Sequence, residues 1–218
     1  MIYIDNDGKQ FSGAGVLIIE DYYNRYNVCI PTVLLVRNAS SGNYGDFGGM
    51  YEKHHTDLQH TAIEELREES LNLFDIDSSF LDTYVDIPTT RDNIYYRTYI
   101  IKINNVSRKH YMYNYDLIEQ CYYNKIRIPR CWRETDDITH VPISNLLNNI
   151  DLHTNNVIDV YHNYVKLTTR TKKIIKYSKE VLESHSNIKA IGNKDNFYIN
   201  DTKDFLNGTY TFVLNKHK

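Results

Sequence analysis

The sequence predicts an α/β domain in which a mixed β-sheet packs against helices. Its 218 residues, 41% of them hydrophobic and 13% aromatic, suffice for one well-formed core. Several apolar segments have the length and composition of strands, and one strongly periodic helical segment follows a glycine-rich stretch. Strands and helices interleaved along the chain in this order favour an α/β sandwich.

The N-terminal segments are expected to form two strands and a loop. Residues 11–19 (FSGAGVLII) indicate a strand whose small residues allow a neighbour to pack closely. Residues 28–36 form a second apolar run, and we expect its strand to begin after Pro31 because proline disfavours a strand interior. Residues 39–49 (ASSGNYGDFGG) are rich in Gly and Ser and predict a loop.

The clearest helix is predicted over residues 57–73, with Thr56 or Asp57 as its N-cap. Its apolar residues lie close to one stripe, as expected for a helix with one buried face: Leu58, Ala62, Leu66 and Leu73.

The second half of the chain predicts a less regular series of elements. Residues 80–87 and 94–103 are expected to be strands, 108–130 an insertion, 138–142 a last core strand, 155–167 and 170–184 helices, and 197–214 a hairpin. We therefore expect a core domain over residues 1–150 and a C-terminal helical extension over residues 151–218 that packs on the same domain.

Composition argues against several classes of protein. The longest apolar runs are far too short to cross a bilayer, and the N-terminus does not have the pattern of a signal peptide. Three cysteines without a CxxC pair indicate neither a disulfide framework nor a cysteine-built zinc site, so an intracellular, cytoplasmic protein is expected. The net charge of −3 provides no overall basic field for nucleic acid, although a local patch remains compatible with it.

The acidic residues of the predicted helix carry the strongest chemical signal. Glu65, Glu68 and Glu69 stand at positions i, i+3 and i+4, so their carboxylates share one helix face, and Glu64 precedes them. A hard divalent cation such as Mg²⁺ or Mn²⁺ would turn this repulsion into a ligand set. The alternative is an acidic face that is simply solvated.

Residues 48–73 (GGMYEKHHTDLQHTAIEELREESLNL) resemble the Nudix box: a glycine, five residues, a glutamate, seven residues, then Arg-Glu-apolar-x-Glu-Glu-x-Gly-apolar. Residues 65–69 match the acidic core, and Phe47-Gly48-Gly49 matches the preceding glycine turn. The chain departs from the pattern in four ways. The spacing from Gly49 to Glu64 is one residue longer, Glu64 replaces the arginine, Leu71 replaces the second glycine, and no glutamate falls at the upstream acidic position.

The resemblance implies a Nudix-like α/β/α sandwich and a hydrolase that cleaves a phosphoanhydride bond in a nucleoside diphosphate-linked substrate. It implies that the carboxylates hold Mg²⁺ or Mn²⁺, with the Gly49 carbonyl as a further ligand. The proton acceptor would be Glu68 or Glu134, with Asp136 and Asp137 as alternatives to Glu134. An ordinary acidic loop explains Glu134, Asp136 and Asp137 equally well. Trp132 is a candidate for stacking on a base, and the alternative is a core tryptophan.

Two substrate types fit this resemblance: small free nucleotides or nucleotide sugars, and the 5′ cap of mRNA. A composition rich in Asn, Ile, Lys and Tyr is typical of AT-rich genomes, and the chain resembles the Nudix decapping enzymes of large DNA viruses in size and box. Lys172, Lys173, Lys176 and Lys179 form a basic stripe, with Arg170 nearby, that is either a solvated face or a contact for phosphate or an RNA backbone. We favour capped RNA; a non-catalytic Nudix-fold binding module is the further alternative. His54, His55 and His60 lack strict zinc spacing and predict a solvated loop.

Overall fold

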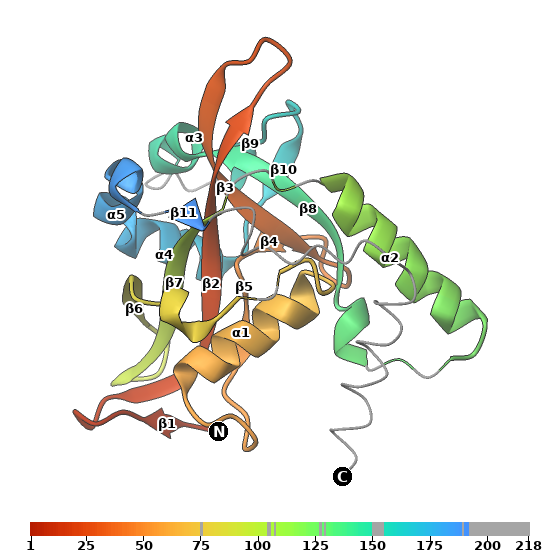
Figure 1. The fold of residues 1–218 in the computed structure, drawn as a ribbon. Helices are drawn as coiled ribbons and strands as arrows, with labels where there is room; N and C mark the ends of the chain where they lie inside the picture. Colours follow the sequence, from red (N-terminus) through yellow and green to blue (C-terminus); the bar gives the residue numbers. More distant parts are fainter. Residues whose placement is uncertain are drawn as a thin grey trace.

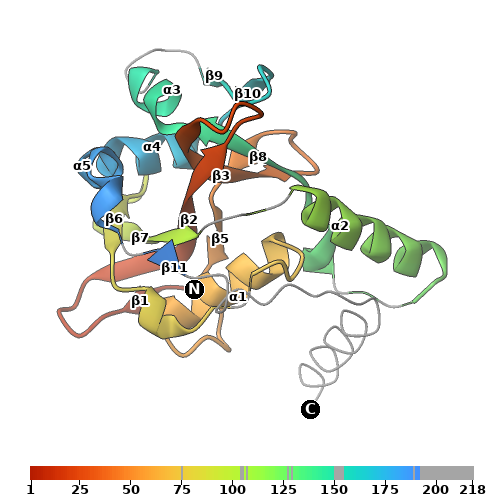
Figure 2. The same cartoon turned by 45° about the horizontal axis from the view of Figure 1, so that its top comes forward.

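In the computed structural model, a mixed β-sheet separates two groups of helices (Figure 1). The structure describes residues 1–191 except 75, 104, 105, 107, 127, 129, 150–154 and 189. Helices α1 (Leu58–Glu69) and α2 (Arg108–Tyr123) pack into the core on one face of the sheet. Helices α3 (Ile143–Asn148), α4 (Thr169–Tyr177) and α5 (Lys179–Glu183) pack into the core on the other face (Figure 2). The predicted α/β sandwich is confirmed.

The remaining elements are short 3₁₀ helices and strands. The 3₁₀ helices are η1 (Ser78–Phe80), η2 (Arg130–Arg133) and η3 (His185–Asn187). The strands are β1 (Tyr3–Ile4), β2 (Gln10–Tyr23), β3 (Cys29–Asn38), β4 (Tyr44–Gly45), β5 (Phe47–Met50), β6 (Tyr84–Pro88), β7 (Ile94–Ile103), β8 (Thr135–Pro142), β9 (Asn156–Ile158), β10 (Tyr164–Lys166) and β11 (Ala190–Ile191).

Strand β2 organises the sheet. It pairs in parallel with β7 along one edge, and on its other edge it pairs antiparallel with β5 and then with β3. Its side chains alternate between the two cores: Val16 and Ile18 face the core of α1, whereas Leu17 and Ile19 face the core of α4. Strand β3 continues the sheet into β8. The predicted strands at residues 11–19, 94–103 and 138–142 are therefore confirmed.

Two predictions for the N-terminal half were wrong. Strand β3 begins at Cys29, before Pro31, which pairs with Asp21 of β2. The proline is tolerated because β8 ends opposite Thr32, so only one edge of β3 is paired at Pro31. The second error concerns the glycine-rich loop, whose last residues form β4 and β5. Gly48 and Gly49 pair with β2 because backbones without side chains can approach closely there.

Three predictions for later segments are also revised. Residues 108–123 of the expected insertion form the long helix α2. Residues 156–166 form the β9–β10 hairpin instead of a helix, because the Asp159 carboxylate accepts hydrogen bonds from the Tyr161 and Asn163 backbone amides and holds a turn. The helix predicted over residues 170–184 is divided into α4 and α5. The hairpin predicted over residues 197–214 lies outside the described residues. Within the described part of the chain, no helix is both long and apolar enough to cross a membrane.

Helix α1 begins as predicted and ends four residues earlier than predicted. The Asp57 carboxylate accepts a hydrogen bond from the His60 amide at 2.8 Å, which makes Asp57 the N-cap. Beyond Glu69 the chain turns through Leu71 and Asn72, which have φ angles of 56° and 61°. Asparagine adopts this left-handed region more readily than most residues, whereas Leu71 is strained there. Asn114 of α2 donates to the Leu71 carbonyl at 2.9 Å and so supports the strained turn.

Candidate active site

The backbone of Gly48 faces the acidic helix. In β5 the carbonyl of Gly49 points toward β2, where it lies beside Gly13, whereas the N–H and C=O of Gly48 point the opposite way. The Gly48 N–H donates to Glu69 Oε2 at 2.6 Å. This geometry does not favour the Gly49 carbonyl as a metal ligand, because that carbonyl is directed into the sheet. Gly48 is the glycine whose polar backbone groups reach the site.

Gly49 instead provides space for Glu65. A Cβ atom on Gly49 would collide with the Glu65 carboxylate, so a larger residue at this position would displace that carboxylate from its present place. Glu65 and Glu69 are one helical turn apart and therefore both approach the Gly48–Gly49 backbone. The structure thus brings together two of the predicted metal ligands and the predicted glycines. Glu68, the third, is 7% exposed and close enough to influence the ionisation of Glu65.

The positive charge near Glu65 and Glu69 is too small to balance the negative charge of their ionised carboxylates. Burial, followed by the charge of Glu68, raises the pKa of Glu65 to about 8. Burial also raises the pKa of Glu69 well above its usual value, although Arg170 opposes the shift. A raised pKa means that the ionised form of the carboxyl group is unfavourable at this site. A bound divalent cation would remove this penalty, because it supplies positive charge beside the carboxylate oxygens. The donor set therefore fits Mg²⁺ or Mn²⁺.

Arg170 is a functional candidate that sequence reasoning did not select. It projects from the first turn of α4, on the opposite face of the sheet from α1. Its Nε donates to Asp46 Oδ1 at 3.0 Å, and its Nη2 donates to the Gly48 carbonyl at 2.8 Å. The Asp46 side chain is fully buried and also lies 3.3 Å from the Tyr96 hydroxyl. Arg170 therefore places a cation beside the carboxylates and leaves 37% of its own side chain exposed.

Of the three candidate acids near β8, only Glu134 retains an uncommitted carboxylate. Asp136 accepts a hydrogen bond from Arg37 at 2.7 Å, and Asp137 accepts one from Arg108 at 2.8 Å. The Glu134 side chain is exposed and makes no hydrogen bond or ion pair with any described residue. Its charge contributes to the raised pKa of Glu65, which places Glu134 near the cluster. Glu134 therefore stays the candidate proton acceptor.

The predicted substrate-binding residues occupy different environments. Trp132 is 2% exposed and belongs to the core under α1, so its ring is not accessible for stacking on a base. Lys172 and Lys176 share one face of α4, whereas Lys173 lies on the next face, 3.4 Å from the Pro88 carbonyl. The lysines form two groups instead of one stripe, and Arg170 is the residue of this helix that reaches the acidic site.

A cavity of about 370 Å³ adjoins the cluster. Asp46, Glu69 and Arg170 form its charged wall, and Thr135 lies beside them. Its remaining polar wall consists of short amide and hydroxyl side chains: Asn38, Ser41, Asn43 and Thr168. Thr135 also donates to the Glu69 carbonyl at 2.8 Å and so ties β8 to the end of α1. The cavity combines acidic groups, one cation and neutral hydrogen-bonding groups, as a polar, anionic ligand with bound cations requires.

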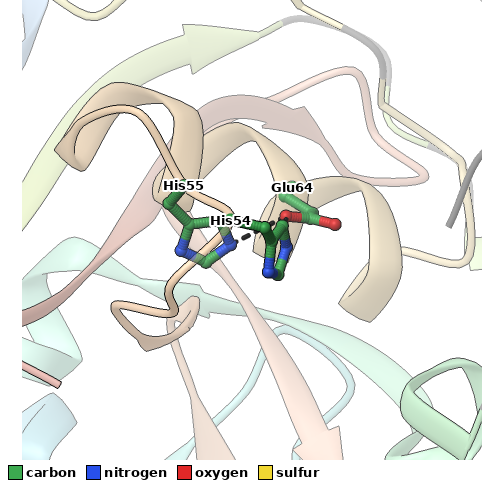
Figure 3. Close-up of side chains that lie close together, drawn as sticks. All are labelled: His54, His55 and Glu64. Atoms are coloured by element: carbon green, nitrogen blue, oxygen red, sulfur yellow. Dashed lines mark hydrogen bonds and ion pairs between the residues drawn. The ribbon is translucent and has the colours of Figure 1, made fainter.

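Glu64 has partners that the sequence analysis did not predict. Nε2 of His54 and Nε2 of His55 each lie 2.7 Å from the same carboxylate oxygen of Glu64 (Figure 3). Glu64 is 7% exposed and the His55 side chain 2% exposed, so the expectation of a solvated histidine loop was wrong for His55. Two imidazoles thus stand around the carboxylate that replaces the arginine of the Nudix pattern.

Comparison with known proteins identifies similar solved structures but no sequence relative. No family model and no curated protein matches the chain. A C. elegans Ap4A hydrolase is 11% identical with a TM-score of 0.42 and covers 78% of this chain and 96% of its own. The M. smegmatis Nudix hydrolase RenU is 13% identical with a TM-score of 0.43, covering 84% and 96%. The NUDIX domain of Shewanella oneidensis NrtR, complexed with ADP ribose, is 14% identical with a TM-score of 0.42, covering 79% and 87%. Likenesses this distant establish neither a family nor a substrate for this chain.

Proposed function

We propose that the chain is a divalent-metal-dependent hydrolase of the Nudix type that cleaves a phosphoanhydride bond in a nucleoside diphosphate-linked substrate. One observation carries the proposal: Glu65 and Glu69 converge on the Gly48–Gly49 backbone, where burial and the charges of neighbouring carboxylates raise the pKa of both carboxyl groups. Such a cluster is unfavourable unless it binds a cation. Residues 1–150 form the proposed hydrolase domain, and residues 151–218 the proposed extension.

Each residue of the site has a role in the proposed reaction. Glu65, Glu68 and Glu69 would hold Mg²⁺ or Mn²⁺, which neutralises the diphosphate and acidifies a water molecule. Arg170 faces the cavity and binds a phosphate oxygen as the negative charge on the leaving group grows. Glu134 accepts the proton of the attacking water. The new P–O bond forms as the bond to the leaving phosphate breaks, and that phosphate departs with its electron pair.

Within this class we propose the 5′ cap of mRNA as the substrate, ahead of small free nucleotides. The support is the position of α4: Arg170 lies in the cavity while Lys172 and Lys176 lie on another face of the same helix. A helix with its cations arranged in this way can contact successive phosphates of an RNA chain that extends outward from the site. Trp132 is buried and cannot stack on a base of the substrate, so the proposal of a capped RNA rests on the lysines.

The test is hydrolysis of a substrate panel with magnesium, with manganese, and with excess chelator. The panel contains dinucleoside polyphosphates, nucleotide sugars, free cap dinucleotide and a capped transcript. We expect metal-dependent release of a phosphorylated product and faster cleavage of the capped transcript than of the dinucleotide. Hydrolysis that continues in chelator contradicts the metal site, and equal rates on the two capped substrates favour small nucleotides. No hydrolysis of any compound supports a non-catalytic binding module.

A further inference from the structure

We propose that His54, His55 and Glu64 form a second metal site that binds a zinc-class ion. Their potential ligand atoms all lie within 4.8 Å of one another (Figure 3). The two histidines lie on the loop between β5 and α1, and Glu64 lies in the second turn of α1. Imidazole and carboxylate are the donors that Zn²⁺ accepts, whereas the proposed Mg²⁺ site nearby contains only oxygen donors. The two sites therefore differ in chemistry.

The arrangement of the donors is close to what coordination requires. Both Nε2 atoms point at Glu64 Oε2, each at 2.7 Å. An ion between them needs distances of about 2.0–2.1 Å to each nitrogen and a similar distance to the oxygen. In a tetrahedral site these bond lengths place neighbouring donor atoms about 3.3 Å apart, so each nitrogen must move roughly 0.6 Å farther from the oxygen than its present 2.7 Å. His54 is half-exposed, with 45% of its side chain accessible, so it can move and leave an open side where water completes the coordination.

The far nitrogen of each imidazole has an oxygen partner of the kind that supports metal-bound histidine. His54 Nδ1 lies 3.4 Å from Glu52 Oε2. His55 Nδ1 lies 3.0 Å from Thr61 Oγ1, whose hydroxyl proton is donated to the Asp57 carbonyl. A proton on each Nδ1 would satisfy these oxygens and leave each Nε2 lone pair for the ion.

In the metal-free protein, another hydrogen bond determines which nitrogen of His55 carries the proton. The Glu52 backbone N–H also points at His55 Nδ1, at 2.9 Å. In that state Nδ1 accepts, and Nε2 carries the proton that it donates to Glu64. Metal binding at Nε2 would require this proton to move to Nδ1, and would exchange the Glu52 contact for the Thr61 contact. The site is therefore predicted to bind zinc more weakly as pH falls, because protons compete for the imidazoles.

Occupancy would join two parts of the proposed catalytic site. The loop that carries His54 and His55 leads from Gly48–Gly49 to α1, and Glu64 immediately precedes Glu65. An ion bound to all three residues fixes the distance between the glycine strand and the acidic helix. Its role is structural, so binding is expected to raise the melting temperature of the protein. This inference does not depend on hydrolase activity.

The test is zinc titration of the full chain by calorimetry in excess magnesium, with thermal unfolding measured in parallel. We expect a 1:1 complex, a higher Tm with zinc, and binding at least about a hundredfold weaker in His54→Ala, the loss expected for a coordinating ligand. His54→Ala is the decisive variant because its exposed side chain contributes little to folding. His110→Ala is the matched control, because this exposed histidine lies on α2 and outside the cluster, whereas the ring of His60 packs against His55 at 5.4 Å. Glu69→Gln separates this site from the glutamate cluster.

Each outcome decides the proposal. Tight zinc binding that is lost in His54→Ala and retained in His110→Ala and Glu69→Gln supports it. Absence of zinc binding at micromolar concentration overturns it and leaves the histidines as hydrogen-bonding partners of Glu64. Zinc binding that survives in His54→Ala and disappears in Glu69→Gln also overturns it, because the ion then occupies the glutamate cluster.

Discussion

Replacing Glu65 by glutamine is expected to stabilise the metal-free protein at alkaline pH. The pKa of this carboxyl group is raised from 4.5 to about 8 by burial and by Glu68. An acid whose pKa is higher in the folded than in the unfolded state stabilises the fold below the unfolded pKa. That contribution is lost as pH rises toward the folded pKa. Between pH 4.5 and 8 the metal-free wild type should therefore lose stability, whereas Glu65→Gln should lose much less.

The size of the effect follows from the shift. Each pKa unit corresponds to about 1.4 kcal/mol, so the full shift sets an upper limit of ~5 kcal/mol. Protons shared with Glu68 and Glu69, together with relaxation of the side chain toward solvent, reduce this value, and we expect about 2 kcal/mol. With a urea m-value of roughly 2 kcal/mol/M, the midpoint of Glu65→Gln at pH 8.5 should lie about 1 M above that of the wild type.

The assay is urea unfolding in chelator at pH 5 and pH 8.5, repeated with magnesium. The two proteins should differ little at pH 5 and by the stated amount at pH 8.5. Added magnesium should stabilise the wild type more than the variant, because the ion requires the ionised carboxylate. A variant that is less stable than the wild type at pH 8.5 in chelator would refute the reasoning that the cluster is electrostatically unfavourable without a cation.

Three further predictions address other parts of the site. Gly49→Ala should lower turnover by roughly tenfold to a hundredfold in steady-state assays, because its Cβ displaces Glu65. Met50→Ala, which changes an exposed side chain on the same strand, should retain normal turnover. Arg170→Met should lower the free energy of unfolding by about 2–3 kcal/mol, because it leaves the buried Asp46 without its cation. The same variant should lower kcat/KM by about a hundredfold. Unchanged kinetics would exclude a role of Arg170 in phosphate binding. Neutralising the α4 lysines at positions 172, 173 and 176 should weaken RNA binding and flatten its salt dependence in filter-binding assays, and unchanged binding contradicts the RNA assignment.

The elements that the sequence predicts well are those with a strong local pattern. Strand β7 and the start of α1 match their predictions, because β-branched and aromatic residues define the first and an Asp57 N-cap defines the second. Elements that depend on distant partners were missed. Strand β5 looks like a loop because its glycines have no strand propensity, and only pairing with Gly15 and Ala14 of β2 makes it a strand.

The acidic part of the candidate site could be anticipated because helical spacing alone places Glu65 and Glu69 on one face. The rest could not. Arg170 is separated from Asp46 by 124 residues, and nothing local distinguishes it from the neighbouring lysines. The partners of Glu64 were missed for a different reason. His54 and His55 are close in sequence, but only the fold of the loop onto α1 shows that both Nε2 atoms meet one carboxylate oxygen.

The most direct test of the account measures magnesium-dependent hydrolysis by Glu69→Gln beside Glu180→Gln. Glu69 accepts the Gly48 N–H at the centre of the proposed metal site, whereas Glu180 is an exposed glutamate on α5, outside it. On the substrate that the wild type cleaves fastest, we predict that Glu69→Gln lowers turnover by at least about a hundredfold, and that Glu180→Gln matches the wild type. Circular dichroism must show both variants folded. Wild-type turnover by a folded Glu69→Gln protein would contradict the assignment of the carboxylate cluster as the metal-binding catalytic centre.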